Sequence, residues 1–156
     1  MRTFVYVDGF NLYYRALKGT HHKWLDLLKL SEAVLPSSAV VERINYYTAR
    51  VSGKRDPDMP RRQQFYFGAH LVRDAFLGAF EQAAIITNDS DLAEPVRIVV
   101  KEVGLPVILL TPENRPVGSL ARLVSDVRHI KPSLSRCQFP DPVGSTKGPI
   151  AKPSDW

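Results

Sequence analysis

The sequence of 156 residues contains a single cysteine, Cys137, and no long hydrophobic run. One cysteine can form neither a disulfide within the chain nor a cysteine-rich zinc site, so a reducing, cytoplasmic setting is expected. No apolar stretch approaches the roughly 18 residues that cross a membrane. The apolar stretch near the N-terminus stops at Asp8, which is too short for the core of a signal peptide. We therefore expect a cytoplasmic protein that binds no membrane.

The composition is that of an ordinary globular chain. Hydrophobic residues make up 44% and charged residues 24% of the sequence, which excludes wholesale disorder. The 21 Lys and Arg residues exceed the 16 Asp and Glu residues by 5, and this net charge favours a polyanionic partner without proving one. Neither a glycine-rich dinucleotide fingerprint nor a P-loop occurs, which disfavours nucleotide-cofactor binding.

Short β-branched and aromatic runs alternate with stretches of helical periodicity. Strands that look apolar on both faces and alternate with helices predict a parallel α/β sheet. Five of the twelve prolines follow position 131, so we expect one domain over 1–131 and a Pro-rich tail, wrapped or disordered, over 132–156. Strands are expected over 4–7, 40–48, 83–87 and 107–110, and helices over 11–18, 24–35, 61–80, 88–103 and 119–127.

Acidic and amide side chains stand where two of these strands end. Asp8 and Asn11 follow the first strand, and Asp89 and Asp91 follow the strand over 83–87. In open parallel sheets, ligands bind outside the carboxyl ends of the strands. Clustered carboxylates repel one another unless a cation or a proton compensates, and Mg²⁺ and Mn²⁺ prefer oxygen ligands. Each residue could instead only cap a helix, but three carboxylates at two strand ends favour a metal site.

Two segments around these residues resemble the signature segments of the NYN domain, a branch of the PIN-like nucleases. They read Val-Tyr-Val-Asp-Gly-Phe-Asn-Leu-Tyr-Tyr at 5–14 and Ile-Ile-Thr-Asn-Asp-Ser-Asp-Leu at 85–92. The likeness extends to the region of Asp126 and to residues 135–140, so it covers most of the chain. The resemblance implies a three-layer, PIN-like Rossmannoid α/β fold whose central parallel sheet has the strand order 3-2-1-4-5.

The same resemblance implies a chemistry. Proteins of this kind are ribonucleases that depend on Mg²⁺ or Mn²⁺. Carried over residue by residue, the likeness makes Asp8, Asp89 and Asp91 the metal-binding residues and Asn11 their polar companion in the catalytic site.

The chain departs from the family pattern in one place. Family members usually carry a further strand, a loop and an acidic segment before the helix that matches 69–76, whereas here 61–67 runs directly into Gly68. The third strand and one metal-site carboxylate are therefore absent. Either the sequence omits a stretch between Phe67 and Gly68, or the chain truly lacks it and fuses two helices. We hypothesise the omission, because Gly inside a helix costs about 1 kcal/mol relative to Ala. An intact mass of 17.5 kDa would refute it.

Several basic and aromatic residues border the expected site. The basic ones could hold a phosphate backbone without reading bases, although each could equally be an ordinary surface residue. They are Arg15, Arg50, Lys54, Arg55 and Arg115. Four tyrosines could stack on bases, but the alternation of strand and helix positions favours the core for them. They are Tyr13, Tyr14, Tyr46 and Tyr47.

The leading hypothesis is a metal-dependent endoribonuclease that hydrolyses RNA phosphodiester bonds, with a homodimer as a possible assembly. The alternative is a catalytically degenerate RNA- or protein-binding module, because one expected carboxylate is absent. A phosphatase of the haloacid dehalogenase type ranks below both, since that chemistry needs an acid where this chain has Phe10.

Overall fold

The computed structural model describes residues 1–48 and 58–156, and its centre is a five-stranded sheet in which all strand pairs are parallel. The strands, in the order β2-β1-β3-β4-β5, are β1 (Arg2–Asp8), β2 (Val40–Tyr47), β3 (Gln82–Ile86), β4 (Val107–Thr111) and β5 (Asp126–His129). The helices are α1 (Gly9–Leu12), η1 (Tyr13–Leu17), α2 (Leu27–Val34), α3 (Met59–Phe76), η2 (Ser90–Leu92), α4 (Ala93–Arg97), η3 (Ile98–Val103), α5 (Gly118–Ala121) and η4 (Lys131–Arg136).

The α/β class and the parallel central sheet are confirmed, and one element differs. The helix expected over 119–127 is wrong: α5 ends at Ala121 and β5 begins at Asp126. Leu120, Leu123, Val124 and Val127 recur at helical spacing, but they reach one core cluster from α5, from the connection after it and from β5. Among the described residues, β2 forms one edge of the sheet and no strand lies beyond it, whereas β5 forms the other edge. The expected order 3-2-1-4-5 therefore cannot be matched to the observed order strand for strand.

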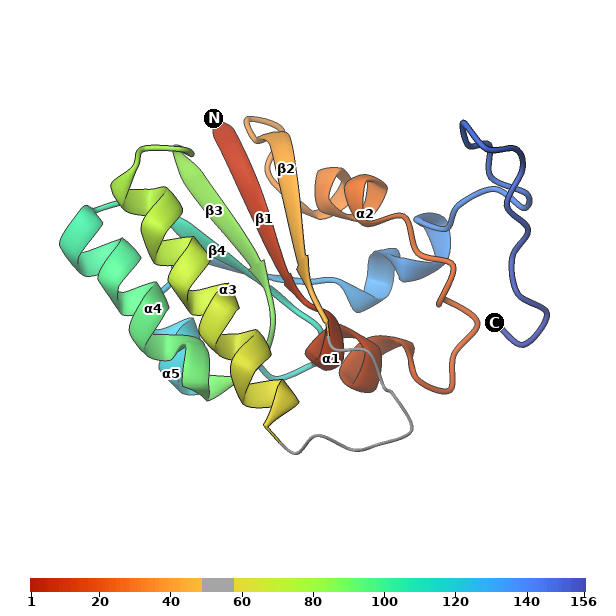
Figure 1. Ribbon diagram of the computed structural model, residues 1–156. Coiled ribbons are helices and arrows are strands. Elements are labelled where there is room, and N and C mark those ends of the chain that lie inside the picture. The colour runs from red at the N-terminus through yellow and green to blue at the C-terminus, as the bar shows by residue number, and fades with distance from the viewer. Residues whose placement is uncertain (49–57) are drawn as a thin grey trace.

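Helices cover both faces of the sheet and bury alternate residues of its strands. On one face, Val5, Ala84 and Leu110 pack with α1, η1, α2 and η4. On the other face, Tyr6 and Ile85 pack with α3, α4, η3 and α5. Figure 1 shows α3 and α4 side by side in front of the sheet and α2 on the far side of β2. The protein is therefore a three-layer sandwich, with β1, β3 and β4 buried on both faces.

Helix α3 runs without interruption through Phe67 and Gly68. The glycine has a packing reason, because a Cβ at Gly68 would lie 2.6 Å from Cγ of Pro95 on α4. Glycine lets two helices approach closely here, and the hypothesis of an omitted stretch between Phe67 and Gly68 stays a prediction.

The residues after position 131 are packed on the domain. Leu134 and Cys137 are buried in the core cluster of the first face, so the expected boundary at 131/132 falls inside a continuous core. The chain then runs along one end of the molecule, away from α3 and α4 (Figure 1). Within the described ranges, no helix is both long and apolar enough to span a bilayer.

Candidate metal-binding site

The site lies where the chain direction across the sheet reverses. From β1 the chain crosses to β2, while β3, on the other side of β1, leads away to β4 and β5. The helices that follow β1 and β3 consequently cover opposite faces, which opens a crevice at the carboxyl ends of these two strands. Asp8 is the last residue of β1, and Asp89 follows β3 by three residues.

Asp8 is buried, with only 3% of the residue exposed, and three hydrogen bonds hold its carboxylate. Its Oδ1 accepts from the Asn11 amide N–H at 3.0 Å and from Gln63 Nε2 at 2.9 Å. Its Oδ2 accepts from the Thr87 hydroxyl at 3.1 Å. Burial raises the pKa of this carboxyl above its usual value, the three hydrogen bonds oppose the rise, and the charge of Asp89 adds to it. The protein therefore keeps a carboxylate at the strand end at an electrostatic cost.

Asp89 meets Asp8 from the start of the next helix. Its Oδ1 accepts from the Asp91 amide N–H at 2.9 Å and caps η2. Its Oδ2 accepts from Gln64 Nε2. Both acids thus cap helices, since Asp8 also caps α1. Capping and a shared site are compatible, because each carboxylate also faces the same pocket.

A pocket of about 130 Å³ joins these groups. It is lined by Asp8, Phe10, Asn11, Gln63, Gln64 and Asp89. The amide oxygen Oε1 of Gln63, a side chain that is only 7% exposed, has no hydrogen-bond partner. Because buried amide oxygens are nearly always paired, this acceptor marks a place where a donor or a cation belongs.

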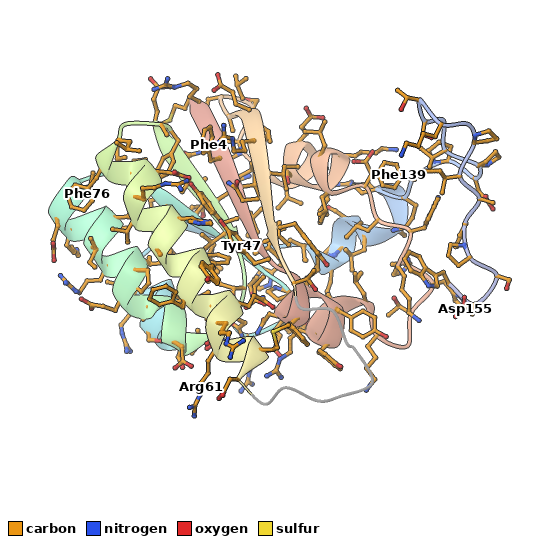
Figure 2. The ribbon with its side chains drawn as sticks, in the orientation of Figure 1. Phe4, Tyr47, Arg61, Phe76, Phe139 and Asp155 are labelled. Atoms are coloured by element: carbon orange, nitrogen blue, oxygen red, sulfur yellow. The ribbon has the colours of Figure 1, made fainter. Side chains whose placement is uncertain are left out.

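Besides Asp8 and Asp89, the site takes in the predicted residue Asn11 and leaves out Asp91. Asn11 lines the pocket, and its Oδ1 accepts from the Asn88 amide N–H at 2.8 Å. Asp91 does not line the pocket: its side chain is exposed beside a neighbouring hollow next to Arg61, at the α3 end labelled in Figure 2. The backbone N–H of Asp91 donates to Asp89 Oδ1.

Sequence reasoning missed three polar side chains. Gln63 and Gln64 come from the first turns of α3, where nothing in the sequence links them to the strand ends. Glu113 follows the last residue of β4 by two positions, so its place near the carboxyl end of a strand was a usable signal. Its Oε2 accepts from Asn88 Nδ2 at 2.6 Å, and its Oε1 lies 2.9 Å from Arg15.

The oxygen atoms available as metal ligands suit a hard divalent cation. Mg²⁺ is commonly held by one or two carboxylates and keeps several waters, so the two carboxylates and Gln63 Oε1 form an adequate donor set. No group of three or more His, Cys, Asp or Glu side chains that could hold a metal occurs among residues 1–48 and 58–156. Any cation would accordingly depend on these two acids and on amide and water oxygens.

The predicted basic and aromatic residues are only partly placed. Arg15 and Arg115 are exposed, and the carbonyl of Arg115 accepts from Asn88 Nδ2 at 3.3 Å, so both border the site. Arg50, Lys54 and Arg55 lie outside the described residues. The expectation that the tyrosines lie in the core is wrong for three of them, since Tyr13, Tyr14 and Tyr46 are exposed. They lie on η1 and on the edge strand β2, where only one face of each element is covered.

Comparisons with known proteins describe the fold better than the activity. No family model matches the chain. A 6-hydroxy-3-succinoylpyridine 3-monooxygenase, HspA of Pseudomonas putida, is 24% identical over 236 residues, which cover all of this chain and 75% of that protein. That span exceeds the 156 residues of this chain by 80, so the relative carries internal segments that this chain lacks. The crystal structure of a protein of unknown function from Vibrio parahaemolyticus superposes with a TM-score of 0.56 at 13% identity, covering 83% of this chain and 92% of that one. This likeness supports the α/β fold alone.

Proposed function

We propose that this chain is a metal-dependent endoribonuclease of the PIN-like type that hydrolyses RNA with Mg²⁺ or Mn²⁺. One observation carries the proposal: Asp8, Asp89 and Gln63, whose buried amide oxygen has no hydrogen-bond partner, line one pocket at the point where the sheet reverses direction. The sequence resemblance to NYN domains and the net charge of +5 support it. At 24% identity, the activity of the monooxygenase is not assigned to this chain.

Electrostatics explains why a cation suits the pocket. Two carboxylates in a small, largely buried space repel each other, and the raised pKa of Asp8 reflects burial first and this repulsion in part. Without a cation, the amide groups of Gln63 and Gln64 donate to the two acids. A dication would replace these weak partial charges with a full compensating charge.

Each residue then has a defined task. Asp8, Asp89 and Gln63 Oε1 would hold the ion, which when bound supplies charge stabilisation at a phosphate oxygen and a more acidic water. Thr87 and the Asn11 N–H fix the orientation of Asp8. The guanidinium groups of Arg15 and Arg115, at the rim, would attract the phosphate backbone.

A catalytically degenerate module is the second candidate, and one observation favours it. The amide of Gln64 already satisfies Asp89, and the described residues offer no third acid at the pocket. Such a module would bind RNA or protein without cleaving RNA.

A circular single-stranded RNA separates these cases, because only an endonuclease can open it. We expect the wild type to open the circle with Mg²⁺ or Mn²⁺ and to stop in EDTA. Asp89→Asn should abolish the opening. The control is Glu94→Gln, which alters an exposed acid that is paired with Arg97 on α4. Cleavage that survives both EDTA and Asp89→Asn would refute the proposal, whereas RNA binding without cleavage would select the degenerate module.

A further inference from the structure

A second hollow, of about 480 Å³, shares no lining residue with the acidic pocket. One wall comes from η1 and the segment that follows it, and the other comes from the chain after η4. Figure 2 labels Phe139 on that second wall. The volume falls in the range of small-molecule pockets. The residues that matter here are Lys23, Trp24, Tyr46, Phe139, Ile150 and Trp156.

Backbone hydrogen bonds fix the two walls against each other. The Asp26 N–H donates to the Cys137 carbonyl at 2.9 Å, and the Phe139 N–H donates to the Trp24 carbonyl at 2.9 Å. The Trp24 indole N–H adds a bond to the Pro140 carbonyl at 3.0 Å. Farther along, Val143 and Ile150 exchange two backbone bonds of 2.8 and 2.9 Å. The hollow is therefore preformed, and a ligand would not pay to assemble it.

Aromatic rings shape the hollow for a flat ligand. Trp24 meets Phe139 and Trp156 edge to face, with ring centroids 6.1 and 5.8 Å apart. The remaining lining side chains are mostly aliphatic. Such a surface loses water readily and packs well against a planar aromatic ring.

The charge of Lys23 determines whether the hollow favours an anionic or a cationic ligand. Of the described residues that line the hollow, Lys23 is the one that carries a formal charge. Its ammonium group opposes a quaternary ammonium ligand, which aromatic cages otherwise favour. It complements a carboxylate or a phosphate instead. We propose that this hollow binds a planar aromatic molecule that carries a negative charge, such as an aromatic carboxylate or a nucleotide.

Tryptophan fluorescence gives a direct assay, because Trp24 and Trp156 are the two tryptophans of the sequence and both line the hollow. Two matched pairs of probes serve: nicotinate against nicotinamide, and AMP against adenosine. We expect the charged member of at least one pair to change the emission and to bind more tightly than its neutral partner. The pair that responds identifies the anion as a carboxylate or as a phosphate.

Lys23→Met tests the charge, and Lys147→Met, at an exposed lysine outside the hollow, is its control. We expect Lys23→Met to weaken binding of the anion about fivefold, to the level of the neutral partner, because an exposed ion pair contributes at most about that factor. Lys147→Met should leave both affinities unchanged. Saturable binding that Phe139→Ala weakens would confirm the location. Equal binding of charged and neutral probes, or no saturable change in emission, would overturn the proposal and leave the nuclease proposal untouched.

Discussion

Replacing Asp8 with Asn and with Ala separates the charge of this side chain from its hydrogen bonds. The Asn amide can keep all three bonds: its oxygen accepts from the Asn11 N–H and Gln63 Nε2, and its NH₂ group donates to the Thr87 hydroxyl oxygen. The Ala variant loses all three bonds and leaves buried donors unpaired. At about 1 kcal/mol each, this loss amounts to about 3 kcal/mol.

The two variants should therefore melt differently. For a chain of this size, about 3 kcal/mol corresponds to a fall in Tm of about 6–12 °C in Asp8→Ala. Asp8→Asn should melt at or above the wild-type temperature at neutral pH, because it removes a buried charge.

The difference between the wild type and Asp8→Asn should depend on pH. The folded-state pKa of Asp8 is raised above the ordinary value of an aspartate side chain. At a pH below that ordinary value, the wild-type carboxyl is protonated in both the folded and the unfolded state, so it is uncharged like the amide of the variant. Wild-type stability relative to Asp8→Asn should then fall as the pH rises from the ordinary value through the folded-state pKa.

Scanning calorimetry, run with and without Mn²⁺, checks the predicted melting temperatures and their pH dependence. The range from about pH 3 to about pH 8 spans the titration of a buried carboxyl. Mn²⁺ at about 100 times its Kd should stabilise the wild type by about 2.7 kcal/mol, or about 5–11 °C, and should leave Asp8→Asn unchanged. Equal Mn²⁺ shifts in both proteins, or an Asp8→Asn variant that melts as low as Asp8→Ala at neutral pH, would refute this reasoning.

Three further substitutions, and a control for the first of them, test the packing around the site by thermal and urea unfolding. Gly68→Ala should lower the free energy of unfolding by up to about 2 kcal/mol, because the clash with Pro95 outweighs the gain in helix propensity. The control Gly118→Ala makes only an ordinary contact and should change that free energy by less than about 0.5 kcal/mol. Equal effects of the two substitutions would contradict the close approach of α3 and α4. Tyr6→Phe should lose about 1.5–3 kcal/mol, because the buried hydroxyl donates to Asp74 Oδ2 at 2.7 Å; no loss would mean that this bond is not formed. Glu113→Gln should change stability by less than about 1 kcal/mol, because its partner Arg15 is mostly exposed; a larger loss would show a stronger role for this pair.

The sequence predicted strands β1 to β4 well and the edge strand β5 badly. Strands β1, β3 and β4 are apolar on both faces because helices cover both sides of the sheet, and that pattern is visible without coordinates. Strand β5 reads Asp-Val-Arg-His, with one apolar residue in four. An edge strand with a mostly polar sequence has no hydrophobic pattern of its own, so the neighbouring helical spacing dominated the prediction.

The candidate site was predictable only where it lies on strand ends. The positions of Asp8 and Asp89 follow from the parallel sheet, since the carboxyl ends of neighbouring strands meet. Which of Asp89 and Asp91 faces the pocket depends on the local turn, in which Asp89 caps η2 and Asp91 points outward. Gln63 reaches Asp8 from 55 residues away because α3 packs across the sheet, and only tertiary structure places it there.

Crystals soaked in Mn²⁺ and measured at the manganese absorption edge test the central claim most directly. The account predicts one anomalous peak in the pocket, within coordination distance of oxygens from Asp8, Asp89 and Gln63, and no peak there in Asp89→Asn crystals. A pocket without a peak at Mn²⁺ concentrations that stabilise the wild type, with both acids still bound to the glutamine amides, would contradict it.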